Sequence, residues 1–104
     1  MKGSFTIGHS IYDGYSKNIN LAIPWYLMAS YLYYQRDISL ISDAEYDEMC
    51  RDILENYQQI EHRHKYLVDV DALAAGTGFQ IDWQKAPKVI IGSAMQIVEK
   101  EGIA

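Results

Sequence analysis

The sequence predicts a small, mainly helical domain of the all-α class, with one short extended segment as the only candidate for a strand. With 104 residues, 49% of them apolar, the chain is long enough for one hydrophobic core and too short for two, so residues 1–104 form a single domain. Ser42-Asp43-Ala44-Glu45 has the pattern of a capping box, in which Ser and Glu side chains satisfy free amides at a helix start. Pro24 and Pro87 each precede apolar residues at helical spacing, and proline favours the first helical turn.

The first helix is expected at residues 23–36, after an irregular arm over residues 1–19. The arm contains Gly3, Gly8 and Gly14 among polar residues and has no helical period. From Trp25 to Arg36 there is neither glycine nor a further proline. This stretch is apolar nearly all round, which predicts burial on several sides or an exposed aromatic patch for a ligand or partner.

The second helix is expected to follow the capping box and to be amphipathic. Its apolar residues recur at helical spacing, while charged residues fill the other side: Tyr46, Met49, Cys50, Ile53, Leu54 and Tyr57 form the apolar stripe. Only residues 37–41 connect the two helices, so we expect a helical hairpin. Cys50 lies on the apolar stripe and is expected to be a packing residue.

Beyond the hairpin the sequence predicts a short helix from Asp69 to Ala75, closed by Gly76. Gly76-Thr77-Gly78 is expected to be a turn, and Phe79–Trp83 alternates as a short strand or extended segment would. Pro87 then opens a last helix, with apolar residues from Val89 to Val98.

Composition argues against several classes of function. There are 14 acidic and 9 basic side chains, for a formal net charge of −5, and the basic ones are scattered, so direct binding to nucleic acid is not expected. A single cysteine allows no internal disulfide and no cysteine-rich zinc site. The most apolar stretch, residues 21–34, is too short to span a bilayer, and the N-terminus lacks the apolar run of a signal peptide. We expect a soluble, cytoplasmic protein that does not contact membranes.

The segment from Tyr33 to Asp47 is similar to the signature of the small N-terminal domain of bacterial NAD-dependent DNA ligases. That signature has paired aromatic residues, an Asp three residues later, and then Ile-Ser-Asp-Ala-Glu-Tyr-Asp, which residues 41–47 match without a break. The spacing from Asp37 to Asp43 is also kept. The resemblance implies a ligase-like helical hairpin at residues 23–67. Residues 68–104 are then a C-terminal extension that the resemblance does not cover.

In those ligases the domain closes over the nicotinamide mononucleotide (NMN) half of NAD. The resemblance therefore implies that NMN or NAD is the ligand and that the binding residues are Tyr33, Tyr34, Asp43, Tyr46 and Asp47. The chemistry is suitable, because oxidised nicotinamide is a cationic aromatic ring that a Tyr face can stack on and a carboxylate can neutralise. The last three residues stand at i, i+3 and i+4 and so share one helix face. Equally, these tyrosines are suited to a core, with their hydroxyl groups at the surface.

The chain departs from the ligases in ways that exclude ligation. None of the six lysines stands in the Lys-x-Asp-Gly context that self-adenylation needs, so we expect no enzyme and no catalytic residues. Ser39 replaces a frequent proline, and the polar segment Glu61–His64 replaces an acidic residue followed by His-Pro. His62 and His64, with nearby carboxylates such as Asp69 and Asp71, are the only metal candidates, but a His-x-His in a polar stretch is usually surface, so no metal is expected.

Two functions remain after these exclusions. The first is a noncatalytic accessory module that binds NMN or NAD. The second is an interaction protein that uses the hairpin as a scaffold. A small stand-alone chain of this kind looks like a phage-encoded, ligase-like protein, for which a host replication or defence protein in the host cytoplasm would be a natural target. The sequence leaves open the partner, the oligomeric state, and whether the C-terminal helix covers Tyr33, Tyr46 and Asp47.

Overall fold

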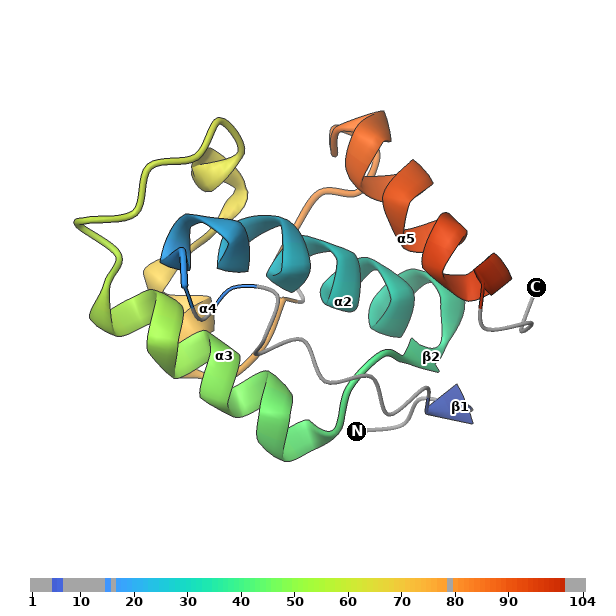
Figure 1. Ribbon diagram of the computed structural model, residues 1–104, viewed down its shortest axis with the longest axis horizontal. Coiled ribbons are helices and arrows are strands. Elements are labelled where there is room, and N and C mark those ends of the chain that lie inside the picture. The colour runs from blue at the N-terminus through green and yellow to red at the C-terminus, as the bar shows by residue number, and fades with distance from the viewer. Residues whose placement is uncertain (1–4, 7–14, 16, 79, 101–104) are drawn as a thin grey trace.

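The computed structural model describes residues 5–6, 15, 17–78 and 80–100, and it is mainly helical, as predicted. Helix α2 (Ala22–Arg36) lies across the middle of the molecule, between α3 (Asp43–Glu55) and α5 (Lys88–Lys100) (Figure 1). The shorter elements are the 3-10 turns η1 (Ile19–Leu21) and η2 (Lys65–Leu67), helix α4 (Val70–Ala74), and the two-residue strands β1 (Phe5–Thr6) and β2 (Ile38–Ser39).

Helix α2 is covered on several sides, which was one of the two outcomes expected from its all-round apolar pattern. Eight of its residues are buried: Ala22, Ile23, Tyr26, Leu27, Met28, Ala29, Ser30 and Leu32. The helix packs against α3, α5, β2 and η1. It ends at Asp37, whose left-handed φ of 56° is tolerated by a short polar side chain, and whose amide donates to the carbonyl of Leu32.

Helix α3 begins where the capping pattern places it. The side chain of Ser42 accepts a hydrogen bond of 3.2 Å from the amide of Glu45. Tyr46, Met49, Cys50 and Ile53 are buried, so the predicted amphipathic stripe is confirmed. Polar side chains cover the opposite side of α3.

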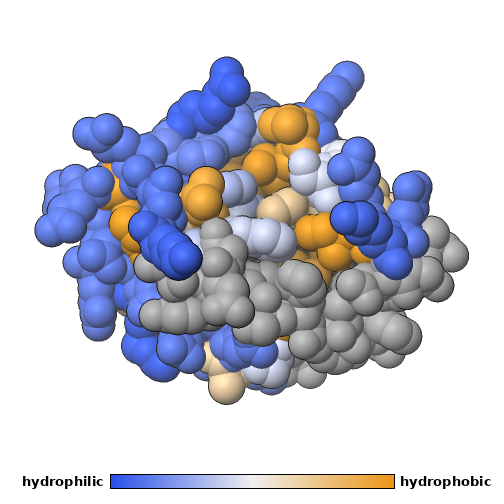
Figure 2. Space-filling model, in the orientation of Figure 1, coloured by the Kyte–Doolittle hydropathy of each residue, from blue (hydrophilic) through white to orange (hydrophobic). Residues whose placement is uncertain are grey.

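One face of the whole molecule is shown in Figure 2, where hydrophobic side chains reach the surface in separate patches between hydrophilic ones.

The extended structure differs from the expectation. Phe5–Thr6, within the expected irregular arm, pairs in parallel with Ile38–Ser39, in the register Phe5 to Ile38 and Thr6 to Ser39. Over residues 80–83, where a strand was expected, the structure has turns, and the amide of Ile81 donates to the carbonyl of Gly78 over 3.2 Å. Phe79 and residues 1–4, 7–14 and 16 lie outside the described residues.

The C-terminal extension follows the predicted order. Helix α4 is followed by Gly76 with φ of +69°, the left-handed position that glycine accepts most easily. Helix α5 packs on α2 and buries Ile90, Ala94 and Val98. Among the described residues, no helix is both long and apolar enough to cross a membrane.

The Ser42 cap provides a direct test of this fold. We expect Ser42→Ala to lower the free energy of unfolding by about 0.5–2 kcal/mol, because an amide in the first turn of α3 loses its acceptor. Ser42→Asp restores an acceptor and should recover most of that loss. Urea unfolding followed by circular dichroism measures both variants. Equal stabilities for the Ala and Asp variants would contradict a capping role.

Candidate functional site

The five residues implied by the resemblance lie along the later turns of α2 and the first turns of α3, but they differ in exposure. Asp43 and Asp47 are exposed, and Tyr33 and Tyr34 are partly buried with their rings edge-on at 4.7 Å. Tyr46 is only 3% exposed. Its ring therefore lies in the core, where the ring centroids of Tyr46 and Tyr26 are 5.9 Å apart.

Residues Gly76, Thr77 and Gly78, here called the Gly76–Gly78 segment, lie over this face. The hydroxyl of Tyr26 donates to the carbonyl of Thr77 over 2.7 Å. The hydroxyl groups of Tyr34 and Thr77 share a hydrogen bond of 2.6 Å. Two tyrosines of α2 therefore hold a segment that is more than forty residues away along the chain.

Both glycines allow a close approach that a side chain would prevent. A Cβ on Gly78 would overlap the hydroxyl of Ser30 and lie 2.9 Å from the hydroxyl oxygen of Tyr46. A Cβ on Gly76 would lie 2.6 Å from Oδ1 of Asp47, in addition to the strain of its positive φ. The segment thus brings Tyr34, Tyr46 and Asp47 together around itself.

The polar groups beneath the segment are mutually satisfied. The hydroxyl groups of Ser30 and Tyr46 form a buried hydrogen bond of 2.5 Å. Burial raises the pKa of both Tyr46 and Tyr26 above the usual value for tyrosine. The nearby Tyr26 phenol raises the pKa of Tyr46 further, whereas hydrogen bonds with Gln80 and Tyr46 offset part of the rise at Tyr26. Both phenols therefore stay protonated at neutral pH and act as hydrogen-bonding groups of the core.

The sequence leaves open whether the C-terminal helix covers Tyr33, Tyr46 and Asp47. In the structure Gly78 lies against Tyr46, and Gly76 lies against Asp47. Sequence reasoning treated Gly-Thr-Gly as a turn and did not select Ser30, Tyr26 or Thr77. The two glycines flanking a hydroxyl residue were the available signal, since a paired glycine often marks a close backbone approach.

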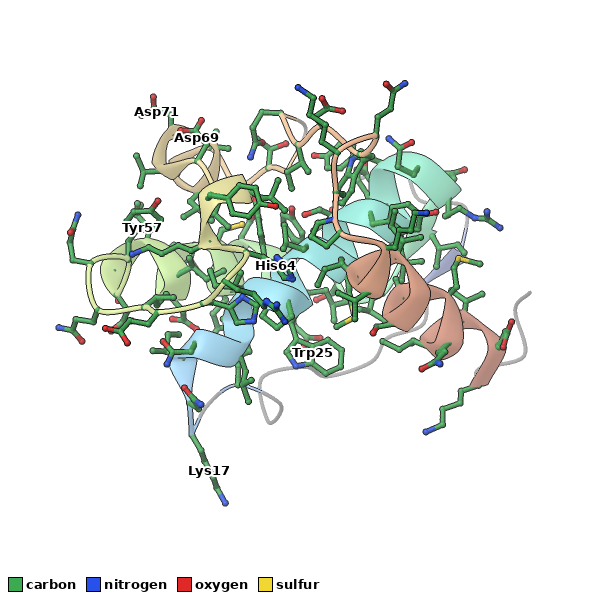
Figure 3. All side chains as sticks on the ribbon, turned by 90° about the horizontal axis from the view of Figure 1, so that it is seen from above. Lys17, Trp25, Tyr57, His64, Asp69 and Asp71 are labelled. Atoms are coloured by element: carbon green, nitrogen blue, oxygen red, sulfur yellow. The ribbon has the colours of Figure 1, made fainter. Side chains whose placement is uncertain are left out.

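The histidines lie elsewhere, beside the beginning of α2. The amide of His64 donates to Nδ1 of His62 over 3.1 Å, and the two rings are 5.4 Å apart. Figure 3 draws Asp69 and Asp71 well apart from His64. Within the described part of the chain, no three His, Cys, Asp or Glu side chains gather in an arrangement that could hold a metal ion.

Two cavities adjoin each other between α2 and α5. The larger, of about 570 Å³, is lined by Trp25, Met28, Ile97 and polar residues of α5. The smaller, of about 240 Å³, lies at the His62–His64 segment, and Met28 and Ser93 line both cavities.

Comparison with protein-family models, with curated proteins and with solved structures finds no match for this chain. The ligase resemblance thus stays an inference from the Tyr33–Asp47 segment.

Glycine at position 78 is required by packing if the Gly76–Gly78 segment lies where the contacts place it. We expect Gly78→Ala to destabilise the protein by about 1–3 kcal/mol, because the new methyl group overlaps Ser30. The matched control is Gly92→Ala, within α5, where an added Cβ meets nothing within 4 Å. That variant should gain about 0.5–1 kcal/mol from lower backbone entropy. Thermal unfolding of both variants measures these changes in stability. If Gly78→Ala leaves the stability unchanged, the Gly76–Gly78 segment does not pack against Ser30.

The Ser30–Tyr46 hydrogen bond should show coupling in a double-mutant cycle. Tyr46→Phe leaves the Ser30 hydroxyl buried without its partner, so a loss of about 1–3 kcal/mol is expected. Ser30→Ala should cost less in the Tyr46→Phe background than in the wild type, because the partner is already absent. Urea unfolding of the four proteins measures the coupling. If the free-energy changes of the two single variants add up to that of the double variant, the Ser30–Tyr46 hydrogen bond is excluded.

Stability should fall at alkaline pH. Burial raises the pKa of the Cys50 thiol to about 12, from an ordinary value of 9.0. Above pH 9 the unfolded chain loses this proton while the folded chain retains it, so stability present at lower pH declines as the pH rises towards 12. The thiol contributes at most about 1.4 kcal/mol per pH unit. Cys50→Ala should flatten the pH dependence of the urea midpoint between pH 8 and roughly pH 10.5. An unchanged slope would show that the Cys50 thiol does not contribute to this pH dependence.

Proposed function

We propose that this protein is a noncatalytic interaction module that binds another protein, with the ligase-like hairpin serving as its scaffold. The observation that carries the proposal is the packing of Gly78 against Ser30 and Tyr46. A nicotinamide ring that stacks on a tyrosine needs an open ring face. Tyr46, which the resemblance would assign to that role, is 3% exposed and belongs to the core.

The charge on α3 supports a partner with a basic surface. Of the thirteen residues of this helix six are acidic and one is basic: Asp43, Glu45, Asp47, Glu48, Asp52 and Glu55 against Arg51. Asp52 accepts a hydrogen bond of 2.8 Å from the hydroxyl of Tyr15, whereas Asp43, Asp47, Glu48 and Glu55 are exposed. Complementary charge steers association and selects against acidic partners.

The class of partner follows from that charge and from the resemblance. Basic protein surfaces are typical of proteins that bind nucleic acid. For a phage-encoded, ligase-like protein, we infer a host replication or defence protein whose basic surface meets the exposed acidic residues of α3. Such binding would occur in the host cytoplasm and would inhibit the partner by covering its nucleic-acid site.

Binding of NMN or NAD is the second candidate. It is favoured by the exposure of the Asp43 and Asp47 carboxylates and by the partial exposure of Tyr33 and Tyr34. These residues retain four of the five side chains of the ligase pattern at the surface. For Tyr46 to take part, the Gly76–Gly78 segment would have to leave Ser30 and Tyr34.

Isothermal titration with NMN and NAD separates the two candidates. We expect the Tyr34→Ala/Asp47→Ala variant to give the same heat as the wild type up to roughly millimolar ligand, because binding at the ligase-like face should be weaker than about −4 kcal/mol. Micromolar binding that disappears in a folded Tyr34→Ala/Asp47→Ala variant would instead establish the nucleotide module and overturn our proposal.

The protein partner is tested through the charge of α3. Host proteins captured by the immobilised chain are identified by mass spectrometry, and the purified candidate is then titrated. Glu48→Lys/Glu55→Lys should weaken binding at least about tenfold and reduce its salt dependence. Asp82→Lys/Glu99→Lys makes the same charge change at exposed positions outside α3 and should leave the affinity close to wild type. Equal weakening by both pairs would show that only net charge matters.

A further inference from the structure

The smaller cavity differs in character from the rest of the protein. This cavity, here called the basic pocket, lies between the first turns of α2 and α5 and the segment His62–Arg63–His64. Its polar lining consists of His62, Arg63, His64 and Ser93, and its apolar wall includes Pro24 and Ile90. Figure 3 shows His64 beside the first turns of α2, the helix that carries Trp25.

The basic pocket carries the opposite charge from the whole chain. The chain has a net charge of −5, yet none of the described residues that line this cavity is acidic. The groups facing the histidines from α2 are Pro24 and Met28, and those from α5 are Val89, Ile90 and Ser93, all uncharged. Within the described lining, Arg63 therefore has no carboxylate beside it to neutralise its charge, which is the composition of an anion site.

The hydrogen bond between His64 and His62 defines a donor at the pocket. Because Nδ1 of His62 accepts from the amide of His64, neutral His62 carries its proton on Nε2 and can donate from there. Burial, and then His64 and Arg63, lower the pKa of His62, and burial and Arg63 lower that of His64. Nδ1 of His64 is buried and has no hydrogen-bond partner among the described residues.

The segment is held in place before any ligand arrives. The amide of Glu61, directly before it, donates to Oδ1 of Asn20 over 2.8 Å. Ile60 on one side and Val68 on the other are both buried. Binding therefore does not have to order the backbone of this segment, which favours recognition of a small ligand.

We propose that the basic pocket binds a phosphate monoester, with its phosphate group on Arg63, His62 and Ser93 and its organic body against Pro24 and Met28. A guanidinium, an imidazole N–H and a hydroxyl from two separate segments suit a tetrahedral dianion, which accepts hydrogen bonds from several directions. Met28 and Ser93 continue into the larger cavity beside Trp25, where the organic body can extend. This site is independent of the acidic face of α3.

Nuclear magnetic resonance at constant ionic strength tests the site, with inorganic phosphate and phenyl phosphate as probes. We expect shifts confined to residues 62–64 and to Ser93 and its neighbours, and a rise in the pKa of His62 and His64, because the dianion offsets their repulsion by Arg63. Phenyl phosphate should bind several-fold more tightly than inorganic phosphate, since its ring buries apolar surface.

Arginine variants supply the matched control. Arg63→Gln should weaken binding of both probes about tenfold or more, as expected for loss of a charge-assisted hydrogen bond. Arg51→Gln removes the same charge from an exposed position of α3 and should change nothing at the pocket. Absence of localised shifts, equal effects of the two variants, or acetate binding as tightly as phosphate would each overturn the proposal.

Discussion

Helix α2 has almost no polar side along its buried length, and the rest of the fold is arranged to cover it. Eight of its fifteen residues are buried, from Ala22 to Leu32. One neighbouring element cannot bury a helix that is apolar nearly all round, because each neighbour covers only one stripe of its surface. Helices α3 and α5 cover two sides (Figure 1), and the Gly76–Gly78 segment is hydrogen-bonded to Tyr26 and Tyr34 of the same helix.

That constraint also gives the ligase-like signature a structural role. Tyr46 fills the space between α3 and α2, and its hydroxyl is paired with that of Ser30. Backbone can come close to this pair only where there is no side chain, as at Gly78. A motif residue that serves the core is retained for packing whether or not a ligand binds, so the motif match and the binding function are separate questions.

Charge is divided between two regions that flank α2. The exposed side of α3 is acidic, while the basic pocket beside α5 is lined by Arg63 and two histidines, with no carboxylate among the lining residues that the structure describes. Charges of opposite sign on separate surfaces favour different ligands, because each attracts groups of the opposite charge. A basic protein surface and a phosphate group can therefore be recognised by one small domain without competing.

The sequence by itself determined the helices and their order, because caps, prolines and apolar spacing act within a few residues. Ser42, Pro24, Pro87 and Gly76 mark helix ends where the structure has them, within one or two residues. Exposure and long-range contact were decided only by the tertiary structure. The pairing of Phe5–Thr6 with Ile38–Ser39, the loss of the expected strand at 80–83 and the cover over Tyr46 all depend on residues distant in the chain. Such contacts form only when apolar surface such as that of α2 is buried, and local patterns do not say which segment will bury it.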